Sequence, residues 1–280
     1  MNSFKSLVLC AARSRLAPGW VKRSSRRKIR RWLRGQTLLV ETSNGVSLEI
    51  IVGDDVDNQI LFDGVFESHL TQLIHSLAIQ GEGYFVDIGC HLGYYSTLVG
   101  KSAPEMQIAA FDANPSMVQR CGDNLRLNGI KAEIQNCGVG REAGILTFTY
   151  SRQHPSLGTF GKAPDIVDDL QSIEVEVLPL NTLLPQGPIW LIKMDIEGFE
   201  YDALSTINAD TAARIENIVL ECSAERLSQC GRQQSDFDQL SWLSDYHIFL
   251  VEGPGLHLPL QSFKEVPDGD QNLWLKKKHS

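Results

Sequence analysis

A short turn near residue 90 combines an acidic residue with two glycines, which are residue types suited to ligand binding. Asp87 lies at the end of an apolar run, and Gly89 and Gly93 follow it four residues apart. Glycine allows positive φ and close backbone approach, and a helix beginning after the turn presents free N–H groups. A dinucleotide fold would place glycine at position 91, where this chain has His91, whose side chain would obstruct a pyrophosphate. The loop therefore favours a ligand without phosphate that carries an amino-acid tail. Asp87 can accept a hydrogen bond from the ammonium group of such a tail.

A second acidic residue, Asp112, ends the next apolar run, 25 residues after Asp87. In nucleotide-binding α/β folds, an acid at this place accepts hydrogen bonds from ribose hydroxyls. Asp112 could instead cap the helix that Pro115 predicts, but Asn114 serves that role equally well. The pair Asp87 and Asp112 therefore indicates an adenosine-type ligand.

Charged residues also gather at the end of a third apolar run, between positions 192 and 200. Lys193 and Asp195 share one face of the expected strand, since strand side chains alternate. Buried charges need a partner or a purpose, so the two residues form either a structural ion pair or part of an active site. In the second interpretation Asp195 lies at the mouth of the pocket, and Lys193 and Glu197 hold its orientation.

Glu221 follows another apolar run, and we expect it to converge with Asp195 and Glu197 above the carboxyl edge of the sheet. Ligands of open α/β sheets bind at that edge. Asp195 and Glu221 are candidate ligands of a divalent cation, because carboxylate oxygens suit magnesium or calcium.

The elements that position these residues alternate between strands and helices, which predicts a parallel sheet with helices on both faces. Before them, residues 36–52 read as a hairpin and 66–77 as an amphipathic helix. The expected strands are 84–88, 108–111, 132–135, 190–194 and 218–220, with closing strands at 247–251 and 273–275; the expected helices are 94–101, 115–127 and 237–243.

Residues 144–189 interrupt this alternation with two strand-like runs, 145–150 and 173–178, and polar loops. We expect this stretch to determine substrate specificity. The acceptor contacts are expected among His154, Ser156, Thr159 and Phe160.

Three motifs, residues 87–95, 111–115 and 192–200, occur in an order and spacing that resemble the FkbM-type methyltransferases. The similarity extends from about residue 60 to 276. It implies a class I methyltransferase fold with a seven-stranded, mostly parallel sheet, S-adenosylmethionine as the methyl donor, and transfer to a hydroxyl of a sugar, glycan or related small metabolite.

The resemblance also implies roles for individual residues. Asp87, Gly89 and Gly93 would hold the methionine end of the cofactor, Asp112 the ribose and Asn136 the adenine, while His91 belongs to the same cofactor-binding loop and could alter the affinity for the cofactor. This chain has Cys90-His91 where the family usually has Ala-Asn, and Asp112 where it usually has Glu.

Methyl transfer to a hydroxyl needs a group that takes up the departing proton, and our hypothesis is that Asp195 accepts that proton or orients the hydroxyl, while Glu197 and Lys193 hold its orientation. Base N-methyltransferases usually carry an (Asp/Asn)-Pro-Pro-aromatic motif at the place of residues 195–198, which differ here. A catalytically silent binding or scaffold protein with the same fold is the other alternative.

The charge of the chain is divided unevenly. Residues 1–34 carry eleven Lys or Arg and no acid, while the remainder has 15 basic and 34 acidic residues, a balance of −19 (15 − 34). Such a body should repel a polyanion, which argues against nucleic acid as substrate. Residues 13–34 are a solvated arm, a helix on an anionic membrane surface, or an organelle presequence.

Composition, with 42% hydrophobic residues in 280, is that of an ordinary globular protein. The six cysteines show no Cys-x-x-Cys pair, which favours a reducing cytoplasm. No apolar segment approaches the ~20 residues that a membrane span needs, and the run 7–12 is too short for a secretory signal. We expect a basic arm (1–35), a hairpin and helix extension (36–80) and a methyltransferase domain (81–280), in a protein that is cytoplasmic or peripheral to a membrane.

Overall fold

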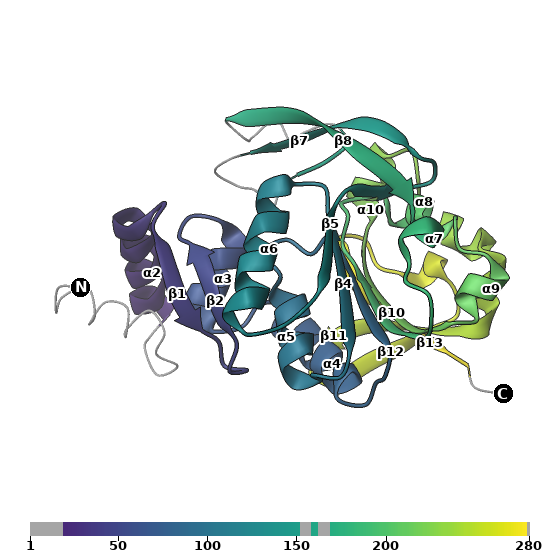
Figure 1. Ribbon diagram of the computed structural model, residues 1–280, viewed down its shortest axis with the longest axis horizontal. Coiled ribbons are helices and arrows are strands. Elements are labelled where there is room, and N and C mark those ends of the chain that lie inside the picture. The colour runs from purple at the N-terminus through teal and green to yellow at the C-terminus, as the bar shows by residue number, and fades with distance from the viewer. Residues whose placement is uncertain (1–18, 152–157, 162–168, 279–280) are drawn as a thin grey trace.

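The computed structural model describes residues 19–151, 158–161 and 169–278. His154, Ser156 and residues 1–18 lie outside the described residues. An eight-stranded sheet forms the centre of the structure, in the order β12-β11-β13-β10-β9-β3-β4-β5 (Figure 1). Its strands are β3 (Tyr84–Ile88), β4 (Gln107–Asp112), β5 (Glu133–Asn136), β9 (Ile189–Met194), β10 (Ile215–Ser223), β11 (Tyr246–Gly253), β12 (Leu256–Leu260) and β13 (Asp270–Lys277).

The five strands β5, β4, β3, β9 and β10 run parallel. The next strand, β13, pairs antiparallel with β10. This confirms the expected mostly parallel sheet. The expected number of seven strands is wrong by one, because β12 pairs antiparallel with β11 and adds an eighth. The short β12 contains Pro259 and exposes Leu256 and Leu258, as an edge strand can.

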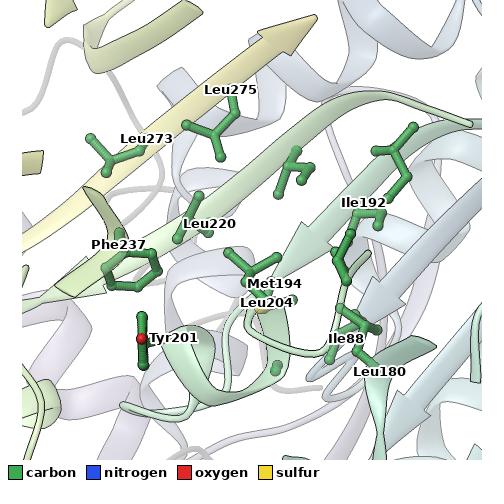
Figure 2. Packing of buried hydrophobic residues seen from close by; sticks show 14 of the residues in the cluster. Ile88, Leu180, Ile192, Met194, Tyr201, Leu204, Leu220, Phe237, Leu273 and Leu275 are labelled. Atoms are coloured by element: carbon green, nitrogen blue, oxygen red, sulfur yellow. The ribbon is translucent and has the colours of Figure 1, made fainter. Parts of the chain in front are cut away.

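The two faces of the sheet bury separate hydrophobic clusters. Val86 and Ile88 contribute to one cluster and the preceding Phe85 to the other; Ile192 and Leu191 on β9 divide in the same way. This alternation is the period of two that strands require. Figure 2 shows part of the first cluster, where side chains of β3, β9, β10 and β13 meet those of the helical segments beneath them.

Helices cover both faces, as the alternation predicted. On one face, helices α4 (Ser68–Ala78) and α5 (Tyr94–Ser102) contribute Leu70, Ile74 and Leu98 to the second cluster. On the other, α8 (Glu200–Leu204) and α10 (Ala224–Gln229) contribute Leu204 and Leu227 to the first. The shorter helices are α7 (Leu180–Leu183), α9 (Ala209–Ala212), η2 (Gln234–Gln239), η3 (Ser241–Asp245) and η4 (Phe263–Glu265).

The helix expected at residues 237–243 is wrong in kind, because two short 3-10 helices, η2 and η3, meet there at an extended Leu240. Two side-chain hydrogen bonds fix η2 as a separate short element. Asp236 accepts the Gln233 N–H in a capping box that starts η2, and Asp238 accepts the N–H of Phe263 in η4, which ties η2 to a distant segment.

The N-terminal part contains helix α2 (Gly19–Leu33), the predicted hairpin of β1 (Thr37–Glu41) and β2 (Ser47–Ile51), and α3 (Asp55–Asp63). Helix α6 (Pro115–Leu127) fixes this hairpin to the sheet. The Asn124 side-chain oxygen accepts the Glu49 N–H at 2.7 Å, and Asn128 exchanges hydrogen bonds with the backbone of Ser47. The two amide side chains therefore pair with the free edge of β2 as a neighbouring strand would.

A three-stranded sheet of β6 (Gly138–Gly140), β8 (Leu170–Pro179) and β7 (Gly144–Ser151) lies beyond the carboxyl end of β5 (Figure 1). It contains both strand-like runs predicted between residues 144 and 189. Thr159, from the segment that joins β7 and β8, pairs with Thr149. No helix in the described part of the chain has the length and apolar character needed to cross a membrane.

Candidate active site

A cavity of about 260 Å³ opens at the carboxyl ends of the parallel strands, where the sequence analysis expected the site. Gly89, His91, Asp112, Lys193, Asp195, Glu197 and Glu221 all line it. Asp87, Gly93 and Asn136 lie outside its wall, so their contact with a cofactor stays a prediction.

Gly89 lies where two strand ends approach each other most closely. Asp195 donates its N–H to the carbonyl oxygen of Ile88 at 3.0 Å, so the segment after β9 remains paired with the end of β3. A Cβ atom at Gly89 would lie 1.9 Å from the carbonyl oxygen of Asp195. With φ at 76°, only glycine fits here without strain.

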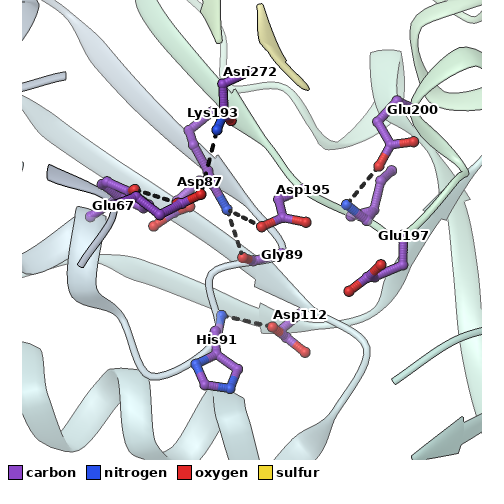
Figure 3. A network of polar contacts seen from close by, with 12 residues as sticks. Glu67, Asp87, Gly89, His91, Asp112, Lys193, Asp195, Glu197, Glu200 and Asn272 are labelled. Carbon is purple, nitrogen blue, oxygen red and sulfur yellow. Dashed lines mark hydrogen bonds and ion pairs between the residues drawn. The ribbon is translucent and has the colours of Figure 1, made fainter. Parts of the chain in front are cut away.

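Asp112 ties the glycine loop to the start of helix α6. One of its carboxylate oxygens accepts the His91 N–H at 2.8 Å (Figure 3), and the other accepts the Asn114 N–H at 2.8 Å. Asn114 itself caps α6 through the Ser116 N–H, which confirms the predicted helix start. Burial raises the pKa of Asp112 to about 6. Each of its oxygens keeps a second lone pair for another donor.

The His91 side chain points away from Lys193 and Asp195 (Figure 3). Its backbone has a positive φ of 50°, which a histidine rarely adopts, and neither ring nitrogen has a hydrogen-bond partner among the described residues. Burial lowers the pKa of His91 to about 4, so the imidazole is neutral at physiological pH. At this position the backbone N–H, rather than the ring, faces Asp112.

Lys193 is the central cation of the site and is only 5% exposed. It stands opposite Asp87 in the pairing of β9 with β3, and its Nζ lies 3.4 Å from Asp195 Oδ2 and 3.3 Å from the Gly89 carbonyl oxygen. Burial alone would lower the pKa of Lys193, but the carboxylates of Asp195, Asp87 and Glu67 raise it above its usual value. Lys193 therefore carries a permanent positive charge among three acids.

Asp87 lies behind this lysine, completely buried. One of its oxygens accepts the N–H and the hydroxyl of Ser96, at 3.1 and 2.6 Å, and so fixes the first turn of α5. Its other oxygen has no hydrogen-bond partner among the described residues. Burial raises the pKa of Asp87, although Lys193 and Ser96 oppose that rise.

Asp195 presents its carboxylate to the cavity, with 34% of the side chain exposed. Its expected neighbour Glu197 forms an ion pair with Arg226, and the backbone of Glu197 adopts a positive φ of 60°. Glu200 holds the turn between them, because its carboxylate accepts the N–H groups of Ile196 and Gly198. Of the two residues expected to orient Asp195, Lys193 contacts it directly.

Glu67 is a site residue that the sequence analysis did not assign. Its carboxylate accepts the Tyr95 hydroxyl at 2.7 Å and the Asn272 amide at 3.4 Å, and burial raises its pKa. Glu67 starts α4 with a positive φ of 36° yet forms no capping hydrogen bond. The side chain is therefore oriented towards the cavity instead of towards its own helix.

Glu221, at the end of β10, completes the acidic lining near Asn272, its partner in the pairing with β13. Burial, with the nearby Asp195 and other acids, raises the pKa of Glu221 to about 10, so its carboxyl group is protonated and can donate a hydrogen bond. Glu221 lines the same cavity as Asp195 and Glu197. The described residues contain no group of three His, Cys, Asp or Glu arranged to hold a metal ion.

Aromatic residues form the remaining wall. The rings of Phe148 and Phe160 lie 5.0 Å apart, and those of Phe160 and Phe199 lie 5.5 Å apart. Phe160 and Thr159, two of the four expected acceptor contacts, line the cavity.

Asn136 donates both hydrogens of its amide to the backbone oxygens of Asp112 and Ala113.

The strand order from β5 to β11, with helices on both faces and a glycine loop and two acids at the carboxyl edge, defines a class I methyltransferase fold. A sequence model of the FkbM methyltransferase domain matches residues 87–246, more than half of the chain. The chain belongs to the FkbM methyltransferase family, whose methyl donor is S-adenosylmethionine.

Two relatives and one solved structure resemble the chain. "Methyltransferase 1" of Beauveria bassiana (strain ARSEF 2860) is 25% identical over 160 residues, which are 50% of this chain and 64% of that protein. "Methyltransferase sdnD" of Sordaria araneosa is 25% identical over 199 residues, 59% of this chain and 75% of that protein. The chain thus spans slightly less than two thirds of the first relative. The SAM-dependent methyltransferase of Agrobacterium tumefaciens aligns with a TM-score of 0.46 and 10% identity, over 87% of this chain and 71% of that one.

Proposed function

We propose that this protein is an S-adenosylmethionine-dependent O-methyltransferase that acts on a hydroxyl group of a sugar, a glycan or a related small metabolite. The observation that carries the proposal is one cavity with two chemically different ends. Asp112 and the glycine loop form one end, and the ion pair of Asp195 with Lys193 forms the other.

The first end fits the cofactor. The free lone pairs of Asp112 suit the two hydroxyls of a ribose, and the missing side chain at Gly89 leaves room for a close approach. Phe111, Met117 and Val139 offer apolar surface for a base. The positive charge of a sulfonium suits the carboxylate of Asp195.

The second end fits methyl transfer to oxygen. S-adenosylmethionine, when bound, supplies an electrophilic methyl group on sulfur. Asp195 accepts the proton of the acceptor hydroxyl while that oxygen bonds to the methyl carbon, and the electrons of the broken carbon–sulfur bond stay on sulfur. Lys193 holds the Asp195 carboxylate in place and, through the Gly89 oxygen, fixes its distance from the loop. General-base catalysis of this kind typically contributes ~100- to 10,000-fold.

The lining also favours a polyhydroxylated acceptor. Glu67 and Asp195 accept hydrogen bonds, and protonated Glu221 donates one, so neighbouring hydroxyls find both kinds of partner. The negative charges of Glu67 and Asp195 disfavour an acceptor that carries phosphate or carboxylate groups. N-methylation of bases has less support, since residues 195–198 lack the motif of such enzymes.

Calorimetry with S-adenosylhomocysteine, followed by transfer of a labelled methyl group to a panel of sugars and lipid-linked glycans, tests the proposal. We expect Asp195→Asn to bind S-adenosylhomocysteine normally and to lose at least about 100-fold in turnover. The exposed Asp210→Asn is the matched control. Near-normal turnover of Asp195→Asn would refute the role of Asp195 as base. If the wild-type protein does not bind S-adenosylhomocysteine, the proposal that it is a methyltransferase enzyme is refuted. A chelator in the same assay shows whether Asp195 and Glu221 hold a divalent cation.

We also infer that the protein works in a reducing compartment such as the cytoplasm. The five described cysteines are all free. Cys90 and Cys121 belong to one buried cluster and form no disulfide.

A further inference from the structure

Helix α2 presents a stripe of four arginines to solvent. Arg23, Arg27, Arg30 and Arg31 follow the i, i+4, i+7, i+8 spacing that places side chains on one helix face. All four are exposed, and none forms an ion pair with a described residue. We call these four residues the arginine stripe.

The opposite face of α2 is fixed to the protein. Ile29 is 1% exposed and packs in the same buried cluster as the hairpin residues Leu48 and Ile50. Arg26 adds an ion pair with Asp63, the last residue of α3. The helix therefore cannot rotate to bury the arginine stripe, and its apolar face is already used within the fold.

A partner for the arginine stripe must be anionic and extended. Residues 19–34 carry eight basic residues and no acid, whereas residues 35–280 carry 15 basic and 34 acidic ones. From Arg23 to Arg31 the stripe covers about 12 Å of helix axis, at a rise of ~1.5 Å per residue. Helix α2 lies at one end of the molecule, so a flat surface can touch it while the acidic body stays behind (Figure 1). Repulsion from that body fades beyond a screening length of about 10 Å.

The catalytic cavity helps to choose between anionic partners. The carboxylates of Glu67, Asp112 and Asp195 line it, which does not suit a polyanionic substrate. The arginine stripe therefore does not serve to guide nucleic acid into the site. We propose that the arginine stripe docks the protein on an anionic membrane surface, peripherally and without insertion of the helix.

Flotation of the full chain with lipid vesicles tests this docking and does not depend on catalytic activity. The vesicles contain phosphatidylcholine alone or with 30 mol% phosphatidylserine, at about 0.05 and 0.3 M salt. Wild-type protein should float with the phosphatidylserine vesicles only, and high salt should release it. At about five-fold per charge, replacing all four stripe arginines by Gln should weaken binding on the order of 500-fold.

A matched variant carries four Gln replacements at the exposed Lys101, Arg126, Lys131 and Lys264. It loses the same charge away from α2, and it should bind within about two-fold of wild type. Thermal unfolding and S-adenosylhomocysteine binding should be unchanged in both variants, which shows that the fold is kept. Equal loss of binding in both variants, or no binding of wild type to phosphatidylserine, would overturn the proposal. Tighter binding to duplex RNA or DNA, dependent on the arginine stripe, would overturn it in favour of nucleic acid.

Discussion

Gly89 is the position where adding a single methyl group should disturb the site most. A Cβ atom there would lie 1.9 Å from the Asp195 carbonyl oxygen and 2.9 Å from its carbonyl carbon. The obstacle is backbone, held by the hydrogen bond from the Asp195 N–H to Ile88, so no side chain can rotate away. An ordinary contact begins at 3.4 Å, so Gly89→Ala needs the two segments to separate by 1.5 Å (3.4 − 1.9).

The cost has two parts. Alanine in the left-handed region costs about 1–2 kcal/mol, and forcing packed segments apart costs a further ~1–3 kcal/mol. We therefore expect Gly89→Ala to lower the free energy of unfolding by about 2–5 kcal/mol. Because the carboxylate of Asp195 moves with its backbone, a displacement of this size should also cost about 100-fold in turnover.

Gly255→Ala separates the two parts of the cost. Gly255 has a similar φ of 68°, but nothing lies within 4 Å of the added Cβ. Chemical denaturation and calorimetry with S-adenosylhomocysteine on both variants measure the difference. We expect at least tenfold weaker binding for Gly89→Ala and unchanged binding for Gly255→Ala. If both variants lose the same stability and bind like wild type, the close approach at Gly89 is not needed.

Two more predictions concern the buried charges. Lys193→Met should lower the free energy of unfolding at pH 7 by about 3–5 kcal/mol, because it leaves the buried carboxylate of Asp87 and the partly exposed carboxylate of Asp195 without their cation. The loss of stability, measured by urea denaturation, should be smaller at acidic pH. Burial raises the pKa of Asp87, so this residue takes up a proton there and no longer needs the cation. If Lys193→Met is as stable as the wild type, the role of Lys193 is contradicted. Burial raises the pKa of Asp112 to about 6, so its carboxylate is lost as the pH falls below that value. The affinity for S-adenosylhomocysteine, measured by calorimetry, should therefore fall about tenfold between pH 7 and pH 5, and a flat profile would argue against ribose binding by Asp112.

Local patterns were sufficient to predict the sheet and the cofactor loop. Helix α6 begins and ends where Pro115 and the apolar spacing placed it, with Asn114 as its cap. The alternation of strands and helices predicted which strand ends share an edge, and therefore that Asp112, Asp195 and Glu221 would line one cavity. In these segments the spacing of the apolar residues and the helix-capping residues indicate the same secondary structure, so a short stretch of sequence is enough to predict each element.

Contacts between distant segments were not accessible in this way. Glu67 and Asn272 are 205 residues apart and meet only because β13 inserts between β10 and β11, which also places Asn272 opposite Glu221. No spacing rule links residues of that separation. Glu197 follows β9 and Arg226 lies in α10, after β10, so their ion pair also joins segments that only the fold brings together. The sequence therefore predicted a charge at position 197 but not its partner.

Some residues in and around the cavity lie inside the segment that matches the family, and others lie outside it. This division suggests how enzymes of this kind come to accept different substrates. Asp112, Lys193 and Asp195, to which we assign the cofactor and the reacting oxygen in our proposal, lie within the matched segment 87–246. Glu67 and Asn272 come from outside it, from the N-terminal extension and the closing strand. Because these two meet beside Lys193 without forming the cofactor loop, they can change while methyl transfer is kept. We therefore expect proteins that share the central segment to differ in acceptor through the segments that flank it, as well as through the loops of residues 144–189 that carry Thr159 and Phe160.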